Sequence, residues 1–112
     1  MPVLHIQANI AIGNTETLLK DASAMVAKAL GKPENYVMVQ LSGDHSMSFA
    51  GTTEPLAYVE LKSLGLSESQ TQSLSSTICT WIQSNLDIQT SRIYIEFSAP
   101  SCSMFGWNGG TF

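Results

Sequence analysis

The chain has 112 residues, of which 44% are hydrophobic and only 12% are charged, and its formal net charge is −4. This length suits one hydrophobic core, and we predict a single domain over residues 1–112. The charge content is about half of the ~25% typical of soluble domains, which favours burial of further surface between subunits. The acidic balance and the lack of any Lys/Arg run exclude a nucleic-acid partner.

The sequence contains no signal for a membrane or a metal. No stretch approaches the roughly 18 apolar residues of a membrane span, and the first ten residues lack the pattern of a secretory leader. Cys79 and Cys102 are distant, with no CxxC or His/Cys cluster of metal spacing. These observations predict a cytoplasmic protein with free thiols, no metal and no membrane partner. His5 and His45 are isolated, and each is expected to be a surface or satisfied polar residue.

The first half of the chain has the pattern of a strand, a helix and a strand. Residues 3–8 alternate apolar and polar, as a half-buried strand does, and residues 36–43 alternate again. Between them, Asn14 is a candidate N-cap, Gly31 is a natural C′ residue, and Pro33 bars continuation of the helix. The helix has an apolar stripe at three- and four-residue spacing, formed by Leu18, Ala22, Met25, Val26, Ala29 and Leu30.

The second half repeats this pattern. Residues 56–64 alternate as a strand, Ser67 and Gln70 form an S-x-x-Q capping box, and residues 92–97 alternate as the closing strand. The tail from residue 99 to 112 is rich in Gly and aromatic residues, and we expect it to be irregular with short strand pieces. The apolar stripe of the second helix consists of Leu74, Ile78, Trp81 and Ile82.

Two such units predict an α+β fold, arranged as a two-layer α/β sandwich. Right-handed crossovers make the two strands of each unit parallel, and no linker separates the units. One mixed four-stranded sheet should therefore hold both, with the two helices on one face. The other face should be polar, because it carries His5, Gln7, Tyr36, Gln40, Glu60, Lys62, Tyr94 and Glu96. It meets either water or other subunits, and the low charge content favours subunits.

Pro2 directly follows the initiator Met1. The initiator is usually trimmed when the next residue is small, and trimming would leave the secondary amine of Pro2 at the N-terminus. An α-amino group titrates near ~7.7–8.0, so it can act as a base near neutral pH. Taken alone, Pro2 is more often a second residue without a role, and a retained Met1 would leave it with an amide nitrogen that is not a base.

Six segments carry a family resemblance through their order and spacing: MP at the start, GKPENYV (31–37), MSFAGTTEP (47–55), KSLG (62–65), RIYIEF (92–97) and FGWNGGTF (105–112). Together with the doubled βαβ unit, they make the chain resemble, over its whole length, the macrophage migration inhibitory factor (MIF) family. This family lies within the tautomerase superfamily that uses an N-terminal proline. The resemblance implies the trimeric tautomerase, MIF-like fold, with an active site at each subunit boundary of a homotrimer.

The resemblance also implies an activity. The N-terminal proline would shuttle a proton between carbon and oxygen of a small aromatic α-keto acid such as phenylpyruvate, and dopachrome-type substrates would also be accepted. No metal or organic cofactor is implied. Pro2 would be the catalytic base, Lys32 the partner of the substrate carboxylate, Tyr94 a donor from the neighbouring subunit, and Tyr36 part of the rim. The apolar lining would be Val3, Leu64, Phe105, Trp107 and Phe112, which could equally be core residues.

Some of these assignments have alternatives. Lys32 could simply complement the helix C-terminus, worth ~0.3–1 kcal/mol. Glu96 stands at a substrate-binding position where the family often has Asn, and its carboxylate would repel an anionic substrate unless paired with Lys32, Lys62 or Arg92. Phe105 is larger than the aliphatic residue common in the family, so the pocket mouth should be narrower.

Two other functions compete with the enzyme. Residues 56–59 hold no cysteine where the family's human cytokine has its CxxC, which leaves a dithiol oxidoreductase role unsupported. The first alternative is a cytokine-like signalling protein, released without a leader, that binds a host receptor and has a vestigial site. The second is a trimeric scaffold without catalysis.

Overall fold

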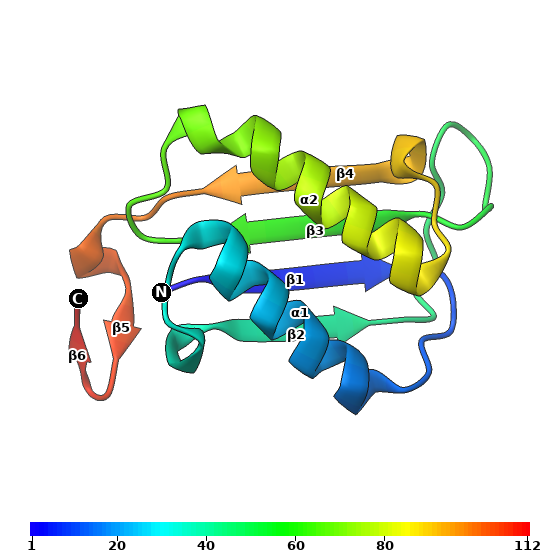
Figure 1. Ribbon diagram of the computed structural model, residues 1–112. Coiled ribbons are helices and arrows are strands. Elements are labelled where there is room, and N and C mark those ends of the chain that lie inside the picture. The colour runs from blue at the N-terminus through cyan, green and yellow to red at the C-terminus, as the bar shows by residue number, and fades with distance from the viewer.

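Two helices lie across one face of a mixed sheet in the computed structural model, which describes residues 1–112 (Figure 1). The main elements are β1 (Val3–Ala8), α1 (Thr15–Leu30), β2 (Met38–Ser42), β3 (Ala57–Lys62), α2 (Glu68–Leu86) and β4 (Ile93–Ser98). The strand order is β2-β1-β3-β4; β1 runs parallel to β2 and antiparallel to β3, and β3 runs parallel to β4. The predicted α+β fold with two parallel βαβ units is confirmed.

Three 3₁₀ turns and a small hairpin complete the chain: η1 (Glu34–Tyr36), η2 (Thr90–Arg92), η3 (Cys102–Met104), β5 (Gly106–Trp107) and β6 (Gly110–Thr111). The tail is therefore irregular with short strand pieces, as expected. The prediction that Tyr36 begins the second strand is wrong. The backbone N–H of Tyr36 donates to the carbonyl of Pro33 at 3.3 Å and that of Val37 donates to Glu34 at 3.0 Å, which closes a turn before β2 begins.

The helix ends follow the sequence signals in two of three cases. Gly31 has φ 66°, and its N–H donates to the carbonyl of Lys28. At the start of α2, the N–H of Ser67 donates to the Gln70 side chain at 3.0 Å, within the predicted capping box. Asn14 precedes α1 but adopts a left-handed conformation, φ 50°, and its side chain makes no capping hydrogen bond. The expected side-chain cap at Asn14 is therefore wrong.

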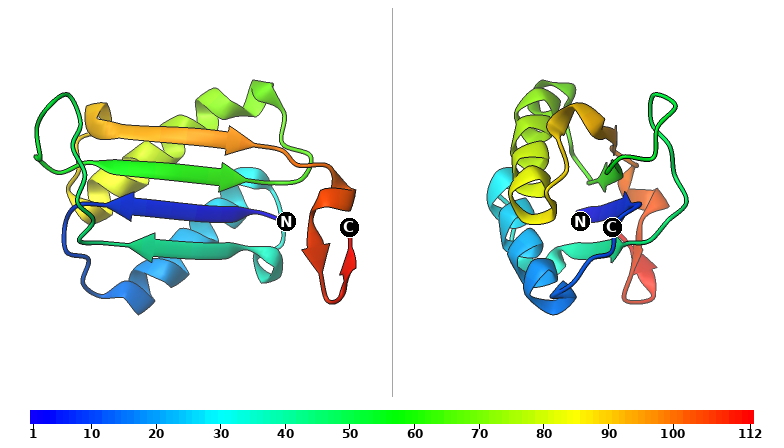
Figure 2. Two further views of the ribbon diagram at one scale, coloured as in Figure 1. Left: turned by 180° about the vertical axis from the view of Figure 1, so that it is seen from behind. Right: turned by 90° about the vertical axis from the view of Figure 1, so that its right-hand side faces the viewer.

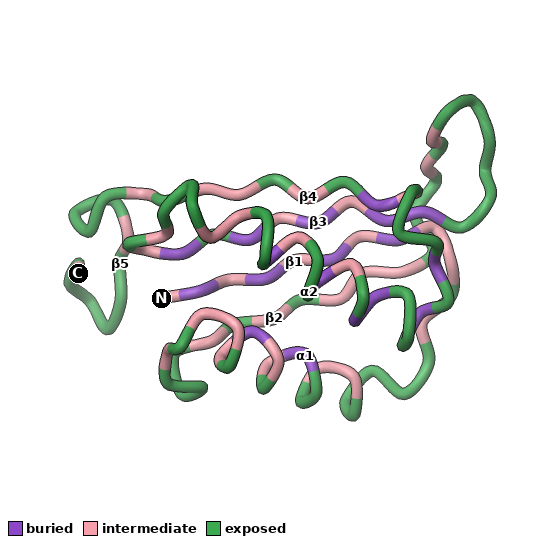
Figure 3. Tube along the Cα trace, turned by 45° about the horizontal axis from the view of Figure 1, so that its top comes forward, coloured by how far each residue is buried: buried purple, intermediate pink, exposed green.

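The core lies between the helices and the sheet. Every second residue of β1 is fully buried, and the residues of both predicted helix stripes belong to the core or pack against it. Figure 3 shows buried residues along β1 and both helices. Burying each large aliphatic side chain contributes roughly 1.5–3 kcal/mol. Neither helix combines the length and the apolar character that crossing a membrane requires. The largest fully buried core side chains are Leu4, Ile6, Val26, Val59, Leu61, Ile78, Ile82 and Ile88.

The other face of the sheet carries no helix (Figure 2). The strand register aligns its side chains in rows, and the middle row consists of Gln40, His5, Glu60 and Glu96. The edge-on view shows the loop of residues 43–56 and the β5–β6 hairpin projecting on this same side (Figure 2). The loop is mostly exposed and lies at the opposite end of the sheet from the N-terminus (Figures 1 and 3). The predicted polar face therefore exists and is uncovered within one chain.

Candidate functional site

A cavity of about 290 Å³ opens at the end of the sheet where β1 begins. The start of β1, the segment from η1 into β2, and the tail hairpin form it, and these segments meet at one end of the molecule (Figure 1). Six of the residues predicted from the sequence line it: Pro2, Val3, Tyr36, Phe105, Trp107 and Phe112. Five further lining residues were not predicted: Met1, Asn35, Val37, Met38 and Gly106.

Pro2 is fully buried at the base of this cavity. Its carbonyl accepts a hydrogen bond from the N–H of Met38 at 3.0 Å, next to the paired residues Val3 and Met38 that open the parallel β1–β2 ladder. Proline has no N–H, so its position at the strand start leaves no donor unsatisfied. The beginning of the chain is thus fixed in position by the sheet.

Lys32 lies beside the N-terminus because of how α1 ends. The N–H of Gly31 donates to Lys28 at 3.2 Å, and that of Lys32 donates to Ala27 at 3.0 Å, which is the Schellman pattern. This turn directs the Lys32 side chain toward the end of β3. There its Nζ donates to the carbonyl of Leu64 at 2.6 Å and to Oγ of Ser63 at 3.1 Å.

This arrangement lowers the pKa of the α-amine of Met1. Burial is the larger cause, and the charge and hydrogen bonding of Lys32 add to it, because both disfavour a second positive charge. Leu64 contributes its carbonyl to Lys32, and it is not among the residues that line the cavity. The prediction of an apolar lining role for the Leu64 side chain is therefore not met within one chain.

The tail provides the aromatic wall. Asn108 and Gly109 have φ angles of 51° and 79°, as the Asn-Gly turn of a tight hairpin requires. The Trp107 and Phe112 rings are stacked, with centroids 5.6 Å apart and planes 16° apart. Tyr36 meets Trp107 edge-on at 5.9 Å, so the wall joins the tail to η1. Such a wall suits a flat aromatic ligand.

Tyr94 and Glu96 lie away from this cavity. In the strand register, Tyr94 of β4 is paired with Tyr58 of β3. Pro2 precedes Val3, which is paired with Lys62, four residues further along β3 than Tyr58. That separation is about 13 Å along the strands. Tyr94 is 65% exposed, and its ring packs on that of Phe49 at 4.7 Å. One chain by itself therefore does not bring Tyr94 into the cavity.

Glu96 accepts a hydrogen bond from the Tyr58 hydroxyl at 3.1 Å. The pKa of Tyr58 is raised, first by partial removal from water and then by Glu96, which favours the protonated phenol. The cations considered as partners from the sequence do not bind Glu96 within the chain: Lys32 binds Leu64 and Ser63, and no salt bridge joins Glu96 to Lys62 or Arg92. The carboxylate is held by a phenol instead.

Arg92 organises the loop against which Tyr94 packs. Its guanidinium carbon lies 5.3 Å from the centroid of the Phe49 ring, and Nη1 donates to the Phe49 carbonyl at 3.2 Å. Further N–H groups donate to the carbonyls of Pro55, Glu54 and Thr52 at 3.0, 3.1 and 3.4 Å. One planar side chain thus binds four carbonyl groups of the loop.

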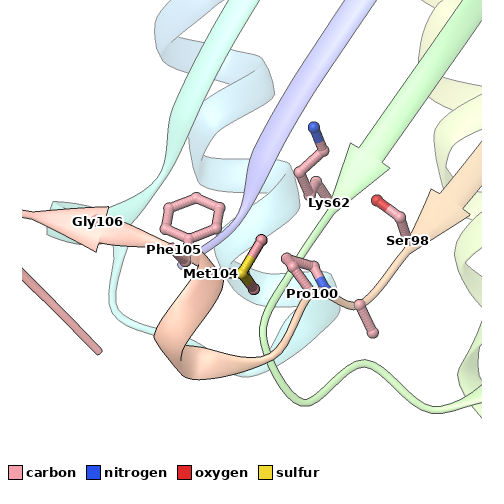
Figure 4. A pocket seen from close by; sticks show the side chains of 7 residues that line it. Lys62, Ser98, Pro100, Met104, Phe105 and Gly106 are labelled. Carbon is pink, nitrogen blue, oxygen red and sulfur yellow. The ribbon is translucent and has the colours of Figure 1, made fainter.

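A second, more open hollow of about 580 Å³ adjoins the first. Figure 4 shows Lys62 and Ser98, from the neighbouring strands β3 and β4, beside Phe105 and Met104 of the tail. Phe105 and Gly106 line both hollows. The sequence pattern predicts Lys62 on the polar face but not at a site. Its register opposite Val3 was the missing information, because strand pairing is not written in a local pattern.

Comparison with known proteins agrees with this architecture. A sequence model of the family described as "Macrophage migration inhibitory factor (MIF)" matches residues 1–112. A macrophage migration inhibitory factor homolog from Brugia malayi is 38% identical over 114 aligned positions, covering 100% of this chain and 99% of that protein. The macrophage migration inhibitory factor of Xenopus tropicalis is 34% identical with the same coverage.

Solved structures show the same fold. The macrophage migration inhibitory factor homologue from Prochlorococcus marinus superposes with a TM-score of 0.94 at 45% identity, covering 98% of each chain. The factor from Trichinella spiralis superposes with a TM-score of 0.91 at 32% identity, covering 98% of this chain and 99% of that one. The full-length sequence match and the shared fold lead to one conclusion: the chain belongs to the macrophage migration inhibitory factor family, within the tautomerase superfamily.

Proposed function

We propose that the protein is a keto–enol tautomerase of the phenylpyruvate type, with Pro2 as the general base once Met1 has been removed. The observation that carries the proposal is the N-terminal amine in a cavity with aromatic walls, its pKa lowered by burial and by Lys32. A lowered pKa increases the neutral fraction of an amine, and only the neutral form can accept a proton. Removal of Met1 transfers the role of terminal amine to Pro2.

The proposed reaction moves one proton and leaves the atoms of the substrate otherwise unchanged. The Pro2 nitrogen takes a proton from the carbon next to the keto group, and the electron pair of that C–H bond forms the enol double bond. The π electrons of the carbonyl move to its oxygen, which takes the proton from the protonated Pro2 amine and so restores the neutral base; the reverse steps return the keto form. The step is redox-neutral, and no metal or cofactor takes part in it as proposed.

Lys32 would bind the substrate carboxylate. An ammonium group has three N–H donors, and the carbonyl of Leu64 and the hydroxyl of Ser63 accept two of them. The third interacts with the α-amine of Met1 and would become available to an anion once Met1 has been removed. The stacked Trp107 and Phe112 rings would hold the aromatic ring of the substrate. This division of roles favours a small aromatic α-keto acid.

We propose that the active unit is a homotrimer. The helix-free polar face and the low charge content support contact between subunits. Tyr94 lies about four residues along the strands from the level of Pro2, so it could donate to a substrate oxygen only across a subunit boundary. A shared site would therefore need the assembled protein, which we expect to act in the cytoplasm.

A direct assay tests the proposed activity. Protein with Pro2 at its N-terminus, verified by mass, is mixed with enol phenylpyruvate, and ketonisation is followed by absorbance. The matched control is the same chain with Met1 retained, in which the Pro2 nitrogen is an amide. We expect catalysis from the first sample and at least a tenfold lower rate from the second. Equal rates would remove the Pro2 amine from the mechanism.

A cytokine-like signalling role is the alternative, and the names of the relatives favour it. In that case a host receptor would recognise the folded surface, and catalysis would be weak or absent. Receptor binding that survives in a catalytically inactive Pro2→Gly protein would support this alternative independently of the tautomerase assay.

A further inference from the structure

Lys62 lies on the uncovered face, and among the Lys and Arg side chains it is the one on that face without a partner in the chain. The chain has five Lys and Arg residues. Lys32 and Arg92 donate to carbonyl groups, and Lys20 pairs with Glu16 at 3.3 Å in the chain's single ion pair. Lys28 lies in the last turn of α1, on the helix side of the sheet. Lys62 is exposed, makes no hydrogen bond, and lines the 580 Å³ hollow beside the Pro2 cavity.

Glu96 is the complementary charge. It is exposed on the same face and lies directly opposite Glu60 in the β3–β4 register. Like charges at paired positions destabilise a sheet, and the only side chain bound to Glu96 is the phenol of Tyr58. Lys62 of the same chain lies two residues along β3 from Glu60 but forms no ion pair with Glu96, so the carboxylate could still be stabilised by a cation from a neighbouring chain.

The position of Glu96 follows from that of Tyr94, if the shared site proposed above is correct. The two residues lie on the same face of β4, two residues apart, which is about 7 Å along the strand. A neighbouring subunit that brings Tyr94 to Pro2 therefore brings Glu96 to the surroundings of the same cavity. On the receiving subunit, Lys62 lies there, opposite Val3 in the register and beside Phe105 (Figure 4).

We propose that Glu96 of one subunit forms an ion pair with Lys62 of its neighbour, at the mouth of the Pro2 cavity. The occupant of the hollow around Lys62 is thus a second copy of this chain. The pair would orient the two subunits, and it would neutralise a carboxylate that otherwise repels an anionic substrate. Because the hollow is large and open, Glu96 could enter it without displacing the core.

Charge reversal tests the pair. Lys62→Glu and Glu96→Lys are made singly and together, and the trimer–monomer equilibrium is measured by sedimentation at low and high salt. We expect each single reversal to weaken the trimer at least tenfold and the double swap to restore it to within about threefold. The difference in trimer stability between each single variant and the wild type should shrink at high salt, because screening weakens exposed ion pairs.

The matched control uses Glu60, which lies next to Glu96 on the same face. The double variant Lys62→Glu with Glu60→Lys should not be restored, because Glu60 is not the proposed partner. If reversal prevents folding, as judged by circular dichroism, the neutral variants Lys62→Gln and Glu96→Gln replace it, and their effects should be less than additive.

Three results with the variants would overturn the proposal, and a fourth concerns the wild-type protein. One is a double variant, Lys62→Glu with Glu96→Lys, whose trimer is no more stable than that of either single variant. Another is equal restoration of the trimer by the Glu60 control variant, which would mean that only the total charge of the face matters. The third is a Lys62→Glu protein whose trimer is as stable as that of the wild type but which binds keto acids with a second carboxylate more weakly. That result would mean that Lys62 binds the substrate and not a neighbouring subunit. A wild-type protein that is monomeric would remove the shared site itself, whereas a wild-type trimer without coupling would remove only this ion pair.

Discussion

The Nζ of Lys32 donates a 2.6 Å hydrogen bond to the carbonyl of Leu64, which joins the end of α1 to the segment that follows β3. The same ammonium group lowers the pKa of the α-amine at the start of the chain. One side chain therefore links the two βαβ units and, together with burial, lowers the pKa of the N-terminal amine.

Replacing Lys32 by Gln should raise the pKa of the N-terminal amine, because a positive charge that disfavours protonation is removed. The acidic limb of the kcat/KM profile should then move to higher pH. The KM for phenylpyruvate should rise as well. A pH–rate series on processed protein measures both, and Lys28→Gln, in the last turn of the same helix, is the control. An unmoved limb would mean that Lys32 does not tune the base.

Replacing Pro2 by Gly should lower tautomerase activity at least tenfold while the trimer persists. A tenfold loss corresponds to about 1.4 kcal/mol of barrier. The fold should survive, because the strand pairing at this position uses the carbonyl of Pro2 rather than its ring. Full activity in the purified variant, with its N-terminus checked by mass, would contradict a role for Pro2.

The processed protein should have about three times the 12.1 kDa mass of one chain in solution. The physical reason is the polar sheet face that neither helix covers. Multi-angle light scattering at micromolar concentration gives the mass directly. A stable monomer would remove both the trimer and any contribution of Tyr94 to a neighbour's cavity.

Replacing Glu96 by Gln should keep the shape of the side chain and remove a negative charge that stabilises the protonated amine of Pro2. If Glu96 reaches the site across a subunit boundary, its loss lowers the pKa of Pro2, and the acidic limb of the kcat/KM profile moves to lower pH. Affinity for an anionic keto acid should rise, because the proposed partner Lys62 would be left unpaired at the mouth of the cavity; Glu60→Gln is the control. An acidic limb that stays in place, or that moves to higher pH, would separate Glu96 from the site.

The same variant has a second readout within one chain. The hydrogen bond from Tyr58 to Glu96 contributes to the raised pKa of the phenol. Loss of the carboxylate should therefore lower the pKa of Tyr58 toward its ordinary value. Ultraviolet titration of the tyrosines measures this change, with Tyr58→Phe assigning the signal. A titration curve unchanged by Glu96→Gln would show that this hydrogen bond is not formed in solution.

Local patterns predicted much of the fold. The alternation over residues 3–8 has the observed bounds of β1, because its inward side chains are fully buried and the opposite ones are not. Gly31 and Pro33 ended α1 through backbone constraints that depend on one or two residues. Such signals are readable because the cause and the effect lie close together in the chain.

What the sequence left open depends on contacts between distant segments. The turn that removes Tyr36 from β2 required knowing which carbonyls its neighbours bind. The contribution of Leu64 is a main-chain oxygen, so its side-chain type carries no information about it. The positions of Tyr94 and Glu96 relative to Pro2 depend on strand register, and their proposed roles depend on a neighbouring subunit.

Arg92 holds the loop next to Tyr94 entirely through main-chain carbonyls and one aromatic ring. Its hold on the loop therefore does not depend on which side chains occupy positions 50–54, all of which are exposed. Positions 52–54 can therefore accept other side chains, provided that the backbone keeps its path, whereas Ala50 and Gly51 have φ angles of 52° and 75° that restrict their replacement. The exposed surface of this loop can thus change chemically while the ring of Phe49 and the ring of Tyr94 packed on it stay in place.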